Sequence, residues 1–193
     1  QKIQQNKCLK KLVFSKDFRE SISIETVSIT GAVVAGFILA SGLKLLEAMP
    51  SLLILIPGFL EIHGSISTSV ASRISAGLFL GVIKPNFKPQ RIIVGNAVAG
   101  IVLSLTLSLF LGLIAYSLES LLFNRANPQV IIISLMASAV SAPILVVTTV
   151  IFSIWFFRRH SDPNNVMGPY ITTLGDIVGI ITLIMIAVKV VYP

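Results

Sequence analysis

Hydrophobic residues gather in five long runs along this chain, and short polar segments that contain proline separate the runs. A helix needs about 20 predominantly apolar residues to cross a hydrocarbon core about 30 Å thick, and each run is long enough. Proline-containing breaks favour helix ends between the runs. The predicted membrane spans are residues 26–46, 51–83, 92–118, 130–157 and 166–192. The pattern therefore predicts an all-α integral membrane protein with five transmembrane helices.

The segment before the first run has a different character. Residues 1–25 are basic and carry apolar positions at Leu9, Leu12, Val13 and Phe14, as in an amphipathic helix. We expect a cytoplasmic head over 1–25, which either lies on anionic lipid or docks beneath the bundle, and a five-helix transport domain over 26–193. The chain begins with Gln1 rather than Met, which is consistent with further residues upstream.

Composition supports a membrane protein and excludes several other classes. Hydrophobic residues make up 54% of the chain, charged residues make up 12%, and the mean hydropathy is +0.92. The net charge of +7 comes from short basic runs between the spans, so it indicates topology rather than nucleic-acid binding. A single cysteine, Cys8, excludes a disulfide framework and a thiolate metal cluster. We expect a multi-pass protein of the cell membrane.

Lys and Arg are distributed unequally between the two sides. Most lie in the head and in the loops after the second and fourth spans, whereas the opposite side has Lys44, Arg125 and Lys189. Because cytoplasmic loops carry the excess of positive charge, we expect a cytoplasmic amino terminus and an outside carboxy terminus.

Small residues recur at four-residue spacing in three of the spans. Such rows let helix backbones approach closely in lipid, so we interpret them as packing seams. They are Gly100, Ser104, Ser108 and Gly112; Gly31 with Ala35 and Gly36 with Ala40; and Ser134, Ser138 and Ala142.

The second span carries a polar stripe. Glu61, Ser65, Thr68 or Ser69, and Ser72 fall at helical spacing after an internal Pro57-Gly58 pair. A Pro-Gly pair within a span is tolerated where neighbouring helices or a lined cavity satisfy the freed backbone groups. Hydroxyl groups also join helices by hydrogen bonds, but a carboxylate does not fit that role. The stripe therefore favours the lining of a wet pathway.

The fifth span carries Asp176 within an otherwise apolar segment. Placing an Asp at bilayer depth costs about 2.5–3.5 kcal/mol, and such residues usually mark ion or proton routes. Gly168, Thr172, Asp176 and Gly179 share a face, while Gly175 and Gly179 allow another backbone to approach. Carboxylate, hydroxyl and carbonyl oxygens suit a hard cation such as Mg²⁺, Ca²⁺ or Mn²⁺. His63 and His160 are weaker candidate ligands.

Two motifs resemble the membrane domain of the MgtE-type magnesium channels and the related solute-carrier magnesium transporters of animals. They are D-P-x-x-x-x-x-P-Y-x-T-x-L-G-D-x-x-G at residues 162–179 and P-x-x-x-x-x-x-G-S-x-x-x-x-x-A-S-R at residues 57–73. The resemblance implies a homodimer whose pore is built from the second and fifth helices of both subunits. It also implies that Asp176 of both copies holds a hydrated Mg²⁺ near the dimer axis.

This resemblance, together with the polar stripe, gives the expected site. The expected metal-binding residues are Asp176, Thr172, Thr68, Ser65 and Gly64, and the expected pore-lining residues are Glu61, Ser69, Ser72, Gly168 and Gly179. Bacterial members of the family carry Gly-Gly-Asn where this chain has His63-Gly64-Ser65. Glu61 stands where relatives tend to have Gly, so it either adds a carboxylate to the route or forms a buried pair.

Three other functions fit parts of the pattern. One is a carrier or exchanger coupled to H⁺ or Na⁺. Another is a membrane enzyme that uses Asp162 and Asp176 to hold a metal for chemistry on lipid phosphate, although H-E-x-x-H, G-x-S-x-G and P-loop motifs are missing from the sequence. The third is a scaffold in which Asp176 pairs with Arg73. A divalent cation channel or transporter, rather than an enzyme, is the favoured interpretation.

Overall fold

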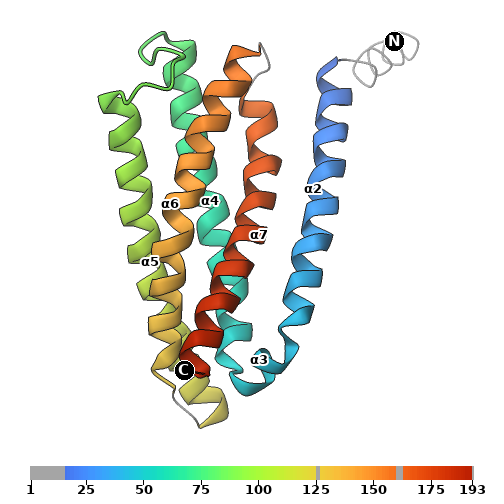
Figure 1. The fold of residues 1–193 in the computed structure, drawn as a ribbon, viewed down its shortest axis with the longest axis vertical. Coiled ribbons are helices and arrows are strands. Elements are labelled where there is room, and N and C mark those ends of the chain that lie inside the picture. The colour runs from blue at the N-terminus through green and yellow to red at the C-terminus, as the bar shows by residue number, and fades with distance from the viewer. Residues whose placement is uncertain (1–15, 125–126, 160–162, 193) are drawn as a thin grey trace, which may run out of the picture.

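The computed structural model describes residues 16–124, 127–159 and 163–192, and every regular element within them is a helix. Five of these helices are long and apolar enough to cross a membrane, as predicted, and α3 is a short addition (Figure 1). The residues of the predicted amphipathic head before Lys16 lie outside the described residues. The helices are α2 (Lys16–Ser41), α3 (Leu43–Ala48), α4 (Ser51–Phe79), α5 (Arg91–Phe123), α6 (Gln129–Arg158) and α7 (Pro163–Val191).

Helix boundaries depart from the prediction at several places, and the largest departure is at α2, which begins at Lys16, ten residues before the predicted first span. The first predicted span was one helix to residue 46, but the chain turns at Gly42 and residues 43–46 belong to α3. α4 ends at Phe79, and Gly81 then adopts a positive φ of 70° in the turn that follows. α5 continues to Phe123, five residues beyond the predicted end, and Asn124 terminates it in the left-handed conformation.

Helix α4 lies at the centre of the bundle. It packs against α5, α6 and α7, and α6 also packs against α5 and α7. α2 stands at the edge and packs mainly on α7 (Figure 1). The Pro57-Gly58 pair does not break α4, which is one helix through both residues.

The predicted packing seams are largely confirmed. Gly100, Ser104, Ser108 and Gly112 are all buried on α5, and the Ser134 hydroxyl of α6 donates a hydrogen bond to the Ser108 carbonyl at 2.7 Å. On α2, Gly31 faces Thr173 of α7 and Ala35 is buried. Gly36 and Ala40 are exposed instead, so this second pair makes no seam within the described part of one chain.

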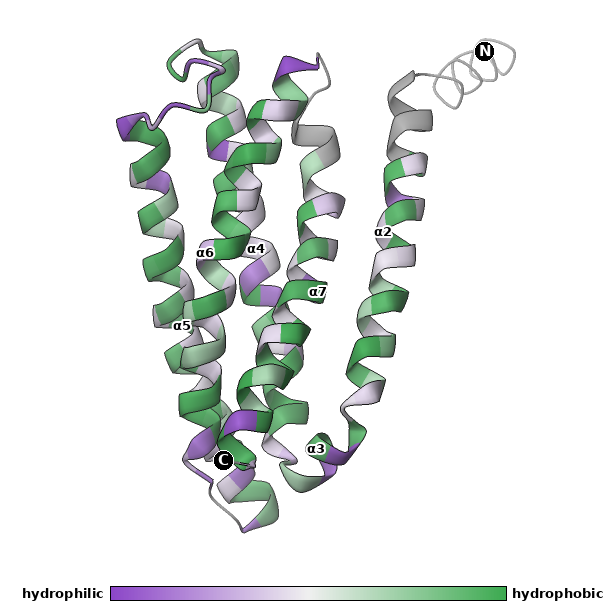
Figure 2. Cartoon of the chain, in the orientation of Figure 1, coloured by the Kyte–Doolittle hydropathy of each residue, from purple (hydrophilic) through white to green (hydrophobic). Residues whose placement is uncertain are grey.

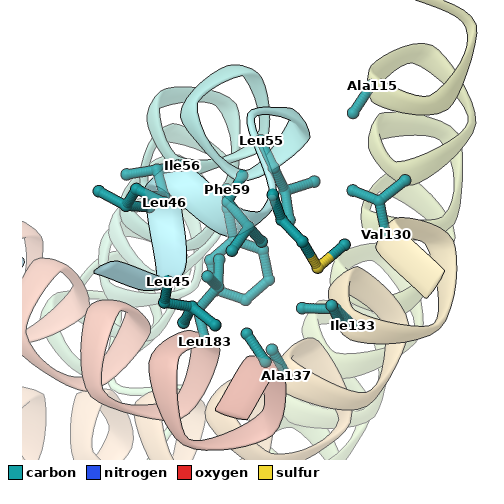
Figure 3. Packing of buried hydrophobic residues seen from close by; sticks show 13 residues of the cluster. Leu45, Leu46, Leu55, Ile56, Phe59, Ala115, Val130, Ile133, Ala137 and Leu183 are labelled. Carbon is teal, nitrogen blue, oxygen red and sulfur yellow. The ribbon is translucent and has the colours of Figure 1, made fainter. Parts of the chain in front are cut away.

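A hydrophobic cluster joins the helices at the end of the bundle that contains α3. Phe59 of α4 is fully buried there, with Leu45 of α3 and Leu183 of α7 in the same cluster (Figure 3). Residues Val130, Ile133 and Ala137 supply the α6 side. This cluster fixes α4 and α7 against each other on one side of the candidate site.

The opposite end of the bundle carries the basic loops. The start of α2, the α4–α5 loop and the end of α6 all lie there (Figure 1). Gln90 fixes the loop because its side chain both accepts from the Lys84 N–H at 2.9 Å and donates to the Lys84 carbonyl at 2.8 Å. Arg158 of α6 lies over the Phe87 ring, 5.2 Å from its centroid, and so ties the loop to α6.

Candidate functional site: a polar face of α4 and α7 within the membrane

One face of α4 is exposed and polar through the middle of the helix. Glu61, Ser65, Ser69 and Ser72 are exposed, and Thr68 is half-buried beside them. Figure 2 shows the hydrophilic colour at mid-height of α4, whereas α5 is mainly hydrophobic over the same height. Polar and charged groups are costly against hydrocarbon, so this face requires water or protein beside it.

Glycine brings α7 against α4 next to this face. A Cβ atom on Gly175 would lie 3.8 Å from the Gly64 nitrogen and 3.9 Å from the Gly64 Cα, so the two backbones nearly touch. A Cβ atom on Gly64 would lie 3.4 Å from the Thr172 methyl carbon. The close approach expected at Gly175 is confirmed, and it places Thr172 beside Gly64.

Asp176 follows Gly175 and lies near the midpoint of α7. Its side chain is half-buried, and the Glu61 carboxylate is close enough for the two charges to interact. The Gly64–Gly175 contact brings Asp176 to nearly the same level of the bundle as Glu61. Two acidic residues of one chain therefore lie on neighbouring parts of α4 and α7 at this face.

The alternative partner of Asp176, Arg73, lies at a different level. Arg73 is nine residues beyond Gly64, which is about 13 Å further along α4 at 1.5 Å per residue. Within the described residues Arg73 forms no ion pair with Asp176, so the scaffold interpretation loses its central contact. Glu61 is exposed in the single chain.

Two threonines direct their hydroxyl hydrogens to the backbone. Thr68 donates to the Gly64 carbonyl at 2.8 Å. Thr172 donates to the carbonyls of Gly168 and Pro169, at 3.1 and 3.0 Å. Since a hydroxyl has one hydrogen and two lone pairs, each oxygen remains able to accept from a hydrated cation's water or to contact the cation itself.

The two remaining glycines of the expected pore lining differ in burial and in their neighbours. Gly168 is half-buried, and a Cβ atom there would meet nothing within 4 Å in the described part of the chain. Gly179 is buried in the α4–α7 contact, where a Cβ atom would lie 3.0 Å from the Leu60 side chain. Gly179 therefore lies off the exposed face and serves the packing of α7 on α4.

His63 points away from the polar face into the bundle. Its Nδ1 lies 2.8 Å from the Phe59 carbonyl, and its Nε2 lies 2.8 Å from the Ser141 hydroxyl of α6. A carbonyl is an acceptor, so Nδ1 carries a hydrogen, and both ring nitrogens are used within the protein. His63 joins α4 to α6, whereas His160 lies outside the described residues. Sequence reasoning did not anticipate Ser141 as its partner.

Glu119 is a buried acid that the sequence reading did not single out. It lies near the end of α5, is 4% exposed, and accepts a hydrogen bond from the Asn127 N–H at 3.3 Å. It thus holds the turn that leads into α6. It lies on the same helix face as Gly112 and Ala115, at spacings of three and four residues, and this spacing is the signal that would have found it.

Acidic and histidine side chains do not form a complete metal cage in one chain. Within the described residues no three His, Cys, Asp or Glu side chains lie together. Glu61 and Asp176 are therefore two carboxylates on an open face, accompanied by neutral oxygen atoms of Thr68, Thr172 and the serines. Such a face fits a hard cation that keeps much of its water better than it fits a fully enclosed ion.

Five helices of the described residues are long and apolar enough to cross a membrane, and carboxylates lie on a polar face near the middle of two of them, which is typical of a multi-pass membrane protein that transports ions. The family model for MgtE, described as a divalent cation transporter, matches residues 56–186, which is more than half of the chain and includes the whole of both motifs. The chain belongs to this family of transporters, which are not enzymes. No protein among those of curated function matches the chain.

Proposed function

We propose that two copies of this chain form a Mg²⁺ channel in the cell membrane, with the ion path between the α4 and α7 helices of both copies. The observation that carries the proposal is the exposed polar face of α4 beside Asp176. In a single chain this face would meet lipid, which is unfavourable for Glu61 and the serines. A two-fold axis would bring two such faces together around water.

The chemistry of the face supports Mg²⁺ as the ion. All the donor atoms are oxygen, from carboxylates, hydroxyls and the backbone. Mg²⁺ gives up its water reluctantly and usually touches one or two carboxylates while it keeps several waters. Asp176 supplies one carboxylate from each copy, two in all, and the divalent charge offsets their mutual repulsion. Mn²⁺ and Ca²⁺ share the oxygen preference and are the ions to compare.

The neighbouring residues would hold the water shell rather than the bare ion. Thr68 and Thr172 present oxygen lone pairs, because their hydrogens go to the backbone. Ser65 and the Gly64 carbonyl lie on the same stretch of α4, and Ser69 and Ser72 continue the path towards the basic end. We propose that this basic end, with the amino-terminal side of α2, faces the cytoplasm.

The decisive experiment is Mg²⁺ uptake by the purified chain in liposomes. In Asp176→Asn the side chain keeps its size but loses its charge, so we expect uptake to fall to that of protein-free liposomes. Glu119→Gln is the matched control, because Glu119 is a buried acid of α5 away from the polar face. Wild-type uptake by folded Asp176→Asn would refute the proposed path.

A coupled carrier is the second candidate, because Glu61 places another carboxylate beside Asp176. Intramembrane acids are common in proton relays and coupled transport. Uptake that follows an imposed proton or sodium gradient at fixed voltage would favour the carrier. Uptake that depends on voltage and the Mg²⁺ gradient alone would favour the channel.

A further inference from the structure

An apolar groove lies between α5 and α6, away from the candidate ion path. Its volume is about 540 Å³, within the range of small-molecule sites. Branched and small side chains of both helices line it, including Ile93, Ala97, Ile101, Val150 and Ile154. Phe87, Lys88 and Pro89 of the α4–α5 loop form one end of the groove.

The length of this groove corresponds to one leaflet of a bilayer. It runs from the loop to Ile101 on α5, ten residues after the first residue of that helix. At 1.5 Å per residue this is about 15 Å, or half of a hydrocarbon core about 30 Å thick. A guest in the groove would thus lie in one leaflet, with one end at the membrane surface.

Positive charge surrounds the surface end of the groove. Lys88 is one of its lining residues, and the Arg158 guanidinium lies 5.2 Å from the centroid of the Phe87 ring, which also lines it. The sequence has no Asp or Glu within residues 81–91 or 151–159 to balance these charges. Basic pockets between transmembrane helices at the surface favour the head groups of anionic lipids.

We propose that this groove binds an anionic phospholipid. One acyl chain lies along Ala97 and Ile101, and the phosphate of the head group contacts Lys88 with Arg158 close by. The charge complementarity at the surface end and the apolar groove of one-leaflet length select this occupant. Neither observation depends on the ion path, so the lipid site can be tested independently of the proposed transport function.

The test is native mass spectrometry of the full chain in mild detergent with added phosphatidylglycerol or phosphatidylcholine. We expect phosphatidylglycerol to be retained more strongly. We also expect Lys88→Gln and Arg158→Gln each to weaken its retention about fivefold, since a basic residue near the surface contributes about 1 kcal/mol to anionic lipid binding. Equal retention of the two lipids by the wild-type chain would overturn the proposal.

Two further variants test the apolar part of the groove. Ala97→Trp fills it and should abolish retention, whereas Val102→Trp adds the same bulk on an exposed position of α5 that does not line it. Lys44→Gln, at the other end of the bundle, should leave retention unchanged. Displacement of phosphatidylglycerol by inorganic phosphate alone, or full retention in Ala97→Trp, would contradict binding of an acyl chain. If Ala97→Trp does not fold, the retention of phosphatidylglycerol by Lys88→Gln still tests the proposed lipid site.

Discussion

At the scale of single residues, the side chain that distinguishes this site is Glu61. It shares a face with Ser65 and interacts electrostatically with Asp176, so a dimer would present four carboxylates around the path. Additional negative charge near the path strengthens the binding of a divalent cation. The cation can then be held while it keeps more of its bound water. We therefore expect Glu61 to adjust the affinity for the cation and Asp176 to be required for its permeation.

Replacing Glu61 with Gln should therefore weaken divalent binding without abolishing uptake. We expect roughly tenfold weaker Mg²⁺ binding, since two charges of the proposed dimer are lost near the ion. The measurement is the Mg²⁺ concentration that half-maximally stabilises the purified protein against heating. Glu25→Gln, an exposed acid of α2, is the control. Wild-type affinity in Glu61→Gln would assign Glu61 to a role outside the ion path.

The His63 contact predicts a stability effect with no transport effect. Ser141→Ala removes the partner of the His63 Nε2 atom between α4 and α6. Hydrogen bonds between helices in membranes contribute about 0.6–1.7 kcal/mol, so the free energy of unfolding should fall by about that amount. Unfolding in a denaturing detergent series measures it, and Mg²⁺ uptake per folded protein should stay constant.

Ser138→Ala is the matched control for this effect. Ser138 lies three residues before Ser141 on α6 and is fully buried, but its hydroxyl has no hydrogen-bond partner among the described residues. Its loss should change stability little, because no bond is broken. Equal destabilisation by the two substitutions would mean that the contact with His63 adds nothing beyond packing.

At the scale of helices, close approach depends on glycine at particular points. A Cβ atom on Gly112 would lie 3.0 Å from the Ile131 Cα, a backbone atom that cannot move away without shifting α6. Gly112→Ala should destabilise the protein by about 1–3 kcal/mol through overpacking, as measured by thermal unfolding. Gly95→Ala on the same helix meets nothing within 4 Å of the described chain, so it should be neutral or stabilising.

Helices and their buried faces were largely predictable from the sequence. Apolar runs specify membrane spans because backbone groups in lipid must be satisfied within the helix, and small residues every four positions specify seams such as Ser104 and Ser108. The exposed face of Glu61 and Ser65 followed from the same periodicity. These features depend on local pattern, which a single sequence contains.

Other features required the packed structure. The break at Gly42 and the extension of α5 to Phe123 leave the hydropathy pattern almost unchanged, so periodicity could not locate them. Whether Gly179 lines a path or packs against Leu60 depends on the rotation of α7 about its axis. The His63–Ser141 bond joins residues of different helices, and no local spacing encodes it.

At the scale of the whole molecule, none of the described helices covers the polar face of α4. α5, α6 and α7 occupy the other sides of α4, while α2 packs on α7. A second copy related by a two-fold axis would cover the face with the same residues, since such interfaces are self-complementary. Residues near the axis then lie close to their own counterparts, which makes the dimer directly testable.

A disulfide bond across the proposed axis is the last prediction. In a Cys8→Ser background, Ser69→Cys places a cysteine on the exposed polar face, and mild oxidation in liposomes should produce dimers on a non-reducing gel. Two cysteines form a disulfide when their Cα atoms are about 4.4–6.8 Å apart, so neighbouring positions Ser65→Cys and Ser72→Cys sample other distances from the axis. Val102→Cys, on an exposed apolar position of α5, controls for random collision. Cross-linking at Val102→Cys but at no position of the polar face would place the α4 faces apart and exclude a shared path, whatever the ion.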